Sequence, residues 1–390
     1  MQSNQVKKRV LIFSTAYYPF VGGAEVAIKE ITDKLSRFYE FDLITARLNK
    51  KLPKIEKVGS VNIYRIGFGI ITLDKIILPF LGLVTAWRLQ KIRRYSCMWG
   101  VMVTYATGIG YLFNISRLLS GERKIPMILT LQEGDSENHL KYKWGGLIAM
   151  SWKLAMRNTD FLTAISNFLL NRAKKNGYNG QYALVPNGVD IDIFSKRINP
   201  KIKEELKIEL NKKPEDIFLV TVSRLVRKNA TDDIISALPH LKNNIHLIVI
   251  GKGSEGMRLQ KQAQDLGVSS RVKFLGFIPY SEIPKYLSVC DVFIRPSRSE
   301  GFGNSFIEAM AAGLPVITTP VGGIPDFIDD KITGIFCSPD NPHSIIQSVK
   351  LILDDNVLRR NIIRGAYHRV SERYTWSNIA QKMKDVFDRF

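Results

Sequence analysis

Short apolar runs bounded by glycine and polar residues recur along the chain, and longer amphipathic stretches separate them. Runs of this length are typical of buried strands in a parallel sheet that helices cover on both faces. The expected strands lie at residues 10–13, 41–45, 61–66, 101–104, 127–130, 161–166, 218–222, 245–250, 272–277, 292–294, 315–318 and 334–337. This alternation predicts an α/β protein with two doubly wound units.

The most informative stretch, residues 296–323, reads PSRSEGFGNSFIEAMAAGLPVITTPVGG and predicts a loop, a helix, a short strand and another loop. Glu300 lies in the glycine-rich loop, and Asn304 and Ser305 open the helix. Helix N-termini carry unpaired N–H groups and partial positive charge, which suit a phosphate. Glu308 lies one turn further in. Two carboxylates beside an anion site suit a nucleotide-sugar.

A structural explanation of the same residues is also open. Ser305 and Glu308 have the spacing of a capping box, in which Glu308 would only satisfy its own helix N-terminus. Glu300 would then be an ordinary loop carboxylate. Spacing alone does not separate this alternative from a ligand site.

The whole string resembles the Glu-x7-Glu signature of the large family of retaining glycosyltransferases with the GT-B fold. Three other strings resemble the family in the same order along the chain: YYPFVGGAE at 17–25, PNGVD at 186–190 and SRLVRKN at 223–229. The resemblance implies two Rossmann-like domains facing across a cleft, at residues 1–190 and 191–373. A C-terminal helix at 374–390 would return to the first domain.

The resemblance also implies roles for single residues of the second domain. Glu300 would bind hydroxyls of the transferred sugar, and Glu308 would bind the ribose. Arg224 and Lys228 would neutralise the donor diphosphate, although many family members carry the lysine one position later, where this chain has Asn229. The positions whose backbone would border the donor are Gly22, Gly23, Gly251, Gly303, Asn304 and Ser305. No metal or other cofactor is expected, because the cations would stabilise the leaving group electrostatically.

Acceptor-side candidates follow the expected strand at 127–130. Family members often carry a His-Asp or His-Gly pair at this strand end, but here Gln132 takes the place of the histidine. Gln132, Glu133 and Asp135 are therefore the residues expected to face the acceptor.

Charge and composition narrow the choice of partners. The chain of 390 residues carries a net charge of +20, and residues 1–180 hold 27 Lys and Arg against 12 Asp and Glu. Such an excess can attract nucleic acid, an anionic membrane or a phosphorylated substrate; no nucleic-acid-binding module is visible, so a membrane surface is the better explanation. Three widely spaced cysteines (Cys97, Cys290 and Cys337) suggest a reducing compartment without a disulfide framework.

The most apolar segment is residues 70–87, but Asp74, Lys75 and Pro79 interrupt it, so it is too short to span a bilayer. It is either a buried helix of the first domain or, with the basic residues that follow, a helix lying in the membrane interface. No signal peptide is recognised. We therefore expect a cytoplasmic protein that can associate peripherally with the inner face of the membrane.

The predicted function is transfer of a sugar from a UDP- or GDP-linked donor to an acceptor hydroxyl, with retention of configuration, in cell-envelope polysaccharide, lipopolysaccharide or glycolipid synthesis. Three alternatives stay open: a GT-B nucleotide-sugar epimerase, a pyridoxal-phosphate phosphorylase, and a non-catalytic membrane-associated binding protein. The sequence identifies neither the sugar nor the acceptor.

Overall fold

The computed structural model describes residues 7–134 and 147–390, and the chain divides into two compact units. The first unit is Met1–Asn187 with Trp376–Phe390, and the second is Gly188–Thr375. Each unit is a Rossmann-like α/β domain, so the predicted fold class is confirmed. The domain boundaries expected after residues 190 and 373 instead follow residues 187 and 375.

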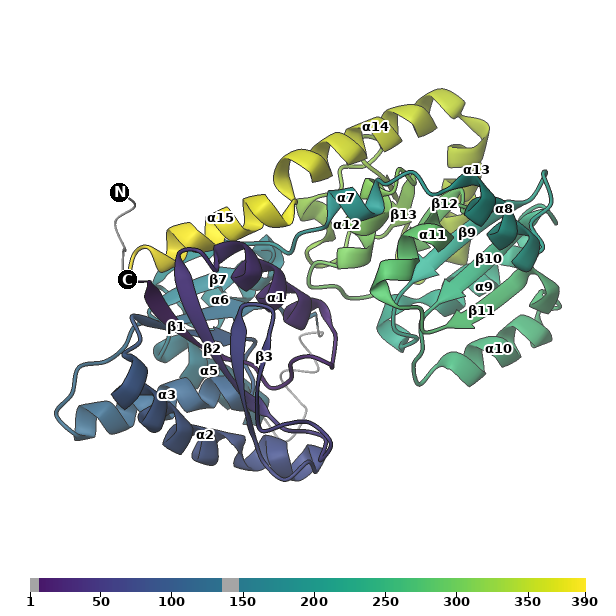
Figure 1. Ribbon diagram of the computed structural model, residues 1–390. Helices are drawn as coiled ribbons and strands as arrows, with labels where there is room; N and C mark the ends of the chain where they lie inside the picture. Colours follow the sequence, from purple (N-terminus) through teal and green to yellow (C-terminus); the bar gives the residue numbers. More distant parts are fainter. Residues whose placement is uncertain (1–6, 135–146) are drawn as a thin grey trace. The chain divides into compact units, whose positions relative to one another are not determined.

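The described part of the first unit contains an eight-stranded sheet in the order β3-β4-β2-β1-β5-β6-β7-β8 (Figure 1). Every pairing is parallel except that of β3 with β4. The strands are β1 Lys8–Phe13, β2 Tyr39–Ala46, β3 Ile55–Val58, β4 Val61–Ile66, β5 Cys97–Val101, β6 Met127–Leu131, β7 Phe161–Ala164 and β8 Gln181–Leu184.

Three strands of this sheet differ from the sequence prediction, and one of them, β8, was not expected as a strand. The strand expected at 101–104 lies at Cys97–Val101, because Met102 has a positive φ of 67° and Thr104 caps the following helix. The short strand β3 was not predicted; it pairs only with β4, at the sheet edge, and alternates exposed with half-buried residues. Such an edge strand lacks the continuous apolar run of a central strand.

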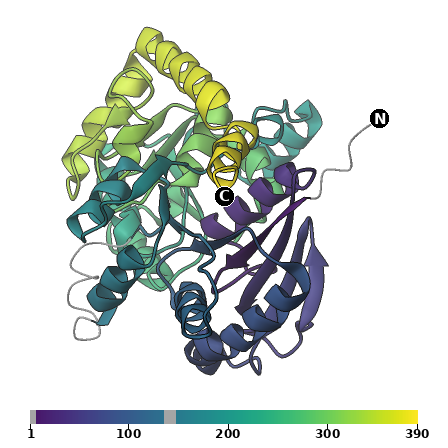
Figure 2. The ribbon, with the colours of Figure 1, turned by 90° about the vertical axis from the view of Figure 1, so that its left-hand side faces the viewer.

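Helices cover both faces of the first sheet. Within the described residues, the helices of this unit are α1 Gly23–Leu35, α2 Ile71–Arg93, α3 Tyr105–Leu119, α5 Leu147–Arg157, α6 Asn167–Lys175 and α15 Trp376–Phe387. Figures 1 and 2 show α1 and α15 side by side, and their apolar residues share one core with β1, β2 and β5. Phe387 of α15 packs edge-on against Trp99 of β5, so the C-terminal helix belongs to the first unit.

The opposite face of the sheet carries α2 and α3. Close packing requires glycine here: a Cβ on Gly82 of α2 would lie 2.5 Å from Ile109 of α3. None of the helices in the described ranges is both long and apolar enough to cross a membrane.

The second unit contains a parallel sheet, six-stranded within the described residues, in the order β11-β10-β9-β12-β13-β14. The strands are β9 Ile217–Val222, β10 Ile245–Ile250, β11 Val272–Gly276, β12 Val292–Arg295, β13 Val316–Thr318 and β14 Ile335–Phe336. All of them lie within one or two residues of the ranges expected from the apolar runs.

Helices again pack on the sheet of the second unit. They are α7 Ile191–Phe194, α8 Pro200–Glu209, α9 Thr231–Ala237, α10 Gly256–Asp265, α11 Ile283–Leu287, α12 Asn304–Ala311, α13 Pro342–Asp354 and α14 Asn356–Arg373, with short 3-10 helices at Arg227–Asn229, Leu238–His240, Ser269–Arg271, Tyr280–Glu282 and Ile324–Asp326. The core joins α9, α10 and α13 to the strands, while Phe306 of α12 packs against Phe293 from the other face.

Candidate active site

Neighbouring strands β10, β9 and β12 bring three of the predicted donor-binding loops to one edge of the second sheet. Gly251 follows β10, Arg224 follows β9, and Glu300 lies in the loop after β12. Ligands of open α/β sheets bind outside the carboxyl ends of the strands, which is this edge.

Helix α12 begins at Asn304, as the sequence predicted, and its N-cap residue is Gly303 with a φ of 93°. Ser305 therefore lies inside the helix, where its hydroxyl accepts a hydrogen bond of 2.8 Å from the Arg295 guanidinium. A capping box would need Ser305 at the N-cap position. The capping-box explanation of Glu308 is therefore wrong.

Glu308 lies in the second turn of α12 and is only 8% exposed, and its side-chain carboxyl has no hydrogen-bond partner among the described residues. Burial raises the pKa of Glu308 to about 7, and the nearby charge of Arg295 opposes this rise. The two carboxyl oxygens keep some solvent-accessible surface, so the hydroxyl groups of a ligand can reach them.

Arg295 is the site residue that sequence reasoning missed. It ends strand β12, is 5% exposed, and pairs with the Glu300 carboxylate. Its guanidinium also donates to the Ser297 hydroxyl over 3.1 Å and lies 4.3 Å from the centre of the Phe306 ring. Burial lowers the pKa of Arg295 to about 10, against the opposing charge of Glu308. The sequence pattern that could have revealed Arg295 is a charged residue at the carboxyl end of a predicted strand, because ligand sites form there.

Glu300 is held by both its side chain and its backbone. Its carboxylate accepts a hydrogen bond of 3.0 Å from the Gly301 N–H, and its carbonyl accepts one of 3.1 Å from the Gly323 N–H. A Cβ on Gly322 would lie 1.8 Å from the Glu300 carbonyl oxygen, and Gly322 has a φ of 59°. The second glycine pair of the signature thus lets the 319–323 loop pass directly behind Glu300.

The predicted phosphate-binding cations lie on the loop after β9. Arg224 is exposed, and its carbonyl accepts a hydrogen bond of 2.6 Å from the Asn229 side chain. Lys228 is half-buried, and its carbonyl accepts a hydrogen bond of 2.7 Å from the Arg298 N–H. Gly251, with a φ of 137°, has room for no side chain, because a Cβ would lie 1.8 Å from the Ser223 carbonyl oxygen.

Gly22 and Gly23 lie in the first unit, at the start of α1, where Gly22 is the N-cap residue. A Cβ on Gly22 would lie 2.7 Å from the Glu25 carboxylate. Burial raises the pKa of Glu25, while the N–H groups of Glu25 and Gly22 oppose the rise. The contact of these glycines with a donor stays a prediction.

The acceptor-side candidates differ in environment. Glu133 is buried after β6, and its carboxylate accepts hydrogen bonds from the N–H groups of Val103 and Gln132, so it fixes the backbone of this strand end. The Gln132 side chain lies 3.5 Å from the amide nitrogen of Asn187. Asp135 lies outside the described residues.

Comparisons with known proteins identify the family of this chain. Residues 21–193 match the family model "Glycosyltransferase Family 4", and residues 202–369 match "Glycosyl transferases group 1". The chain belongs to the glycosyltransferases. The predicted family and enzyme class are therefore confirmed. Among the described residues of this glycosyltransferase, no three His, Cys, Asp or Glu side chains gather as a metal site would require.

Two curated relatives share 31% identity with this glycosyltransferase. One is the uncharacterized glycosyltransferase MJ1607 of Methanocaldococcus jannaschii, aligned over 52% of this chain and 53% of the relative. The other is the GDP-mannose-dependent alpha-(1-6)-phosphatidylinositol monomannoside mannosyltransferase of Mycobacterium tuberculosis, aligned over 58% of this chain and 61% of the relative. These alignments span little more than half the length of each relative.

Two solved structures resemble the whole glycosyltransferase. Sucrose-phosphate synthase from Thermosynechococcus elongatus aligns with a TM-score of 0.83 at 18% identity, over 98% of this chain and 99% of that one. Anabaena Alr3699/HepE in complex with UDP-glucose aligns with a TM-score of 0.78 at 19% identity, over 98% and 100%. At these identities the likeness concerns the fold, and it agrees with the predicted GT-B fold.

Proposed function

We propose that the protein transfers a sugar from a UDP- or GDP-linked donor to an acceptor hydroxyl, with retention of configuration. The observation that carries the proposal is Glu308, a buried carboxyl without a hydrogen-bond partner among the described residues. It lies close to the ion pair of Arg295 with Glu300. The donor named for the mycobacterial relative is GDP-mannose, and HepE was solved with UDP-glucose, so both nucleotides are candidates.

Four of the predicted side chains have a role in this proposal. The ribose hydroxyls donate hydrogen bonds to Glu308, and hydroxyls of the transferred sugar donate to Glu300. Arg224 and Lys228 stabilise the departing diphosphate together with the N–H groups at the start of α12. The phosphate that leaves takes up the proton of the acceptor hydroxyl, so neither a protein nucleophile nor a metal ion takes part.

The experiment is a panel of UDP- and GDP-sugars tested with the wild type, Glu300→Gln and Glu308→Gln, measured by released nucleoside diphosphate. Glu215→Gln, an exposed carboxyl of the same unit, is the matched control. One donor should be consumed by the wild type and the control. Loss of a hydrogen bond to a charged group should lower turnover roughly 10- to 150-fold in the two site variants.

The same experiment tests the alternatives. Donor conversion without an acceptor would identify an epimerase instead of a transferase. Binding of a donor without transfer to any acceptor would indicate a non-catalytic binding protein. Full turnover in both Glu300→Gln and Glu308→Gln would refute the assigned roles.

We also propose that the acceptor is lipid-linked and that α2 lies against an anionic membrane surface. The face of α2 that packs on the protein is narrow: Asp74, Leu78, Gly82, Ala86 and Leu89 are buried. Most of its other apolar side chains are exposed, so the helix is not the buried one that the sequence left open. The acceptor named for the mycobacterial relative is a phosphatidylinositol mannoside, which is a lipid.

Beside its exposed apolar side chains, α2 carries exposed basic residues that suit anionic lipid headgroups. Ile76 is 53% and Phe80 is 66% exposed, and the exposed Arg88, Lys91 and Arg94 lie toward the C-terminal end of the helix. Apolar side chains enter the headgroup boundary while cations bind anionic lipids, and the two contributions add.

Flotation with phosphatidylglycerol vesicles, and with phosphatidylcholine vesicles for comparison, tests the membrane proposal. Burying a Phe or Ile side chain contributes about 1.5 kcal/mol or more. Ile76→Ser with Phe80→Ser should therefore weaken binding to the anionic vesicles at least tenfold. Met257→Ser removes an even more exposed apolar side chain, from the second unit, and should leave vesicle binding unchanged. Absence of wild-type binding to both kinds of vesicle would refute this proposal.

A further inference from the structure

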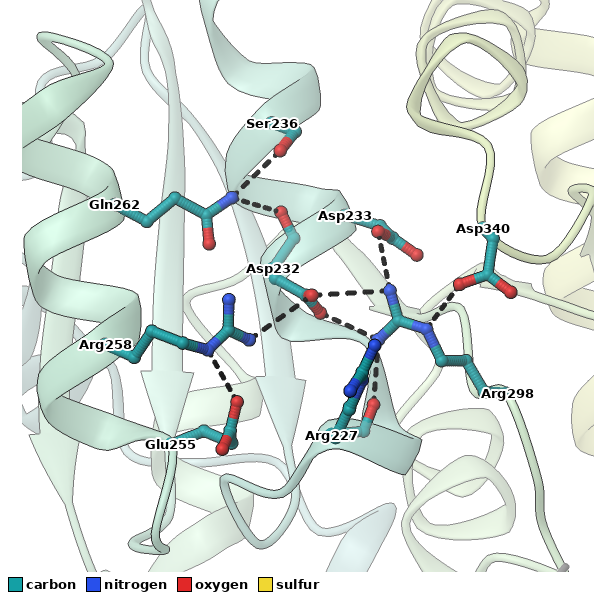
Figure 3. Close-up of polar contacts among 9 residues, drawn as sticks. All are labelled: Arg227, Asp232, Asp233, Ser236, Glu255, Arg258, Gln262, Arg298 and Asp340. Carbon is teal, nitrogen blue, oxygen red and sulfur yellow. Dashed lines mark hydrogen bonds and ion pairs between the residues drawn. The ribbon is translucent and has the colours of Figure 1, made fainter.

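Arg298 lies two residues before Glu300 and is the centre of a polar cluster that the proposed function does not use (Figure 3). Its Nη1 donates to the Arg227 carbonyl over 2.7 Å and to Asp232 over 2.8 Å. Its Nη2 donates to Asp233 over 2.8 Å and to Asp232 over 3.3 Å, and its Nε donates to Asp340. A guanidinium has five N–H groups in one plane, so all of its donors are used.

The same residue joins two loops of the candidate site through the main chain. The Arg298 N–H donates to the Lys228 carbonyl over 2.7 Å, while its side chain binds the carbonyl of the preceding Arg227. The loop that carries Glu300 is thus connected twice to the short helix Arg227–Asn229. Glu300 and Lys228 are proposed to act on opposite sides of the bond that breaks in the donor.

The charge of the cluster argues against direct phosphate binding by Arg298. Two arginines face four carboxylates here, namely Arg258 and Arg298 with Asp232, Asp233, Glu255 and Asp340. A further anion at Arg298 would meet an excess of negative charge, and it would have to displace carboxylates that already occupy the guanidinium.

We propose that Arg298 is a positioning residue for sugar transfer. It holds the loop of Glu300 at a fixed place relative to the short helix Arg227–Asn229, which carries Lys228. The inference rests on the proposed function for its catalytic part. A carboxylate that binds the sugar acts only when it is held within a fraction of an ångström of its productive place, and loop residues need such support. The hydrogen bonds and ion pairs of the Arg298 guanidinium, which lies outside the site, supply this support to the loop of Glu300.

The test compares Arg298→Met and Arg298→Lys with the control Arg258→Met. Arg258 donates to the same Asp232, over 3.3 Å, and to Glu255 over 2.6 Å, but among the described residues it makes no hydrogen bond or ion pair with the loop of Glu300. All three variants change the same acidic cluster, and only those at Arg298 release the Glu300 loop. Turnover with the donor and the affinity for UDP and GDP are measured for each.

We expect Arg298→Met to lower kcat about 10- to 100-fold and to change the affinity for the nucleoside diphosphate less than threefold. Arg298→Lys keeps the charge but not the planar fork, so it should recover only part of the loss. Arg258→Met should leave both quantities within twofold of the wild type. A purely structural role would lower the melting temperature of the Arg298 variants and leave kcat unchanged.

Hydrogen exchange of the ligand-free protein tests the positioning without any substrate. Exchange of the peptide at residues 296–303 should become at least tenfold faster in Arg298→Met and stay unchanged in Arg258→Met. Unchanged exchange in Arg298→Met, or equal losses of turnover and nucleotide affinity, would overturn the inference. If the wild type transfers no sugar from any donor, the proposed function fails, the catalytic part of the inference falls with it, and the exchange data alone decide whether Arg298 fixes the loop.

Discussion

Replacing Glu308 by glutamine removes a carboxyl whose pKa burial raises from 4.5 to about 7, while the shape of the side chain stays nearly the same. In the unfolded chain this carboxyl titrates near its ordinary pKa. Between these two values the folded protein binds the proton more strongly than the unfolded chain does. The stability that comes from protonated Glu308 is therefore fully present below about pH 4.5 and is lost as the pH rises through 7.

The magnitude follows from the size of the pKa shift. Each pKa unit corresponds to 1.36 kcal/mol, so a rise from 4.5 to about 7 corresponds to roughly 3 kcal/mol at most. Most of this difference develops between pH 5 and pH 8, and we expect about 2 kcal/mol after partial relaxation around Arg295. In a domain of this size, 1 kcal/mol shifts the melting temperature by roughly 2–4 °C.

The assay is the melting temperature of the second unit at several pH values from 5 to 8, for the wild type and Glu308→Gln. The variant should gain about 4–8 °C over the wild type across this range. Glu215→Gln removes an exposed carboxyl, and its melting temperature should follow that of the wild type at every pH. A constant difference between wild type and Glu308→Gln, or a difference that shrinks as the pH rises, would refute the argument that burial keeps Glu308 protonated.

Three further outcomes are expected. Arg295→Met leaves the partly buried Glu300 carboxylate without its ion-pair partner, at a cost of about 3 kcal/mol, so the melting temperature should fall by roughly 10 °C and turnover should be lost. A variant as stable as the wild type would contradict the pairing. Gly322→Ala should lower turnover more than tenfold because the new Cβ would clash with the Glu300 carbonyl. The control Gly267→Ala, at a similar positive φ but with open space around the Cβ, should keep full turnover. Equal turnover in both variants would show that the clash with Glu300 is unimportant. Excess EDTA should leave turnover unchanged, and restoration of lost activity by a divalent cation would refute the metal-free proposal.

Most strands could be predicted because central strands of a parallel sheet are buried on both faces and read as apolar runs. The ranges 61–66 and 245–250 match β4 and β10 residue for residue. The edge strand β3 could not be found in this way, because its residues alternate between exposed and half-buried positions. The strand β5 was displaced in the prediction because Val101, Val103 and Thr104 have high β-propensity, whereas Gly100 interrupts the apolar run of Cys97–Val101.

The candidate site was predictable only where its chemistry follows a local pattern. Glu300 and Glu308 lie in one short stretch, so their spacing was visible, and the structure excludes the capping box that competed with it. Arg295 was hidden because a charged residue after three apolar ones marks the end of a strand as readily as a buried partner. The acidic partners of Arg298 lie more than 40 residues away, so only the fold brings them together.

The distribution of satisfied and unsatisfied groups in the candidate site fits the proposed function. Arg295 holds Glu300 from the strand side, and the loop is fixed again through Arg298 by contacts to the neighbouring turn. Glu308 has no such partner. Because the Glu300 carboxylate is fixed before the donor binds, little of the binding free energy is needed to order the loop of Glu300. Donor binding should therefore change hydrogen exchange little at residues 296–303, and its larger effect should fall on the pKa of Glu308, which drops when hydroxyl groups donate to the ionised carboxylate.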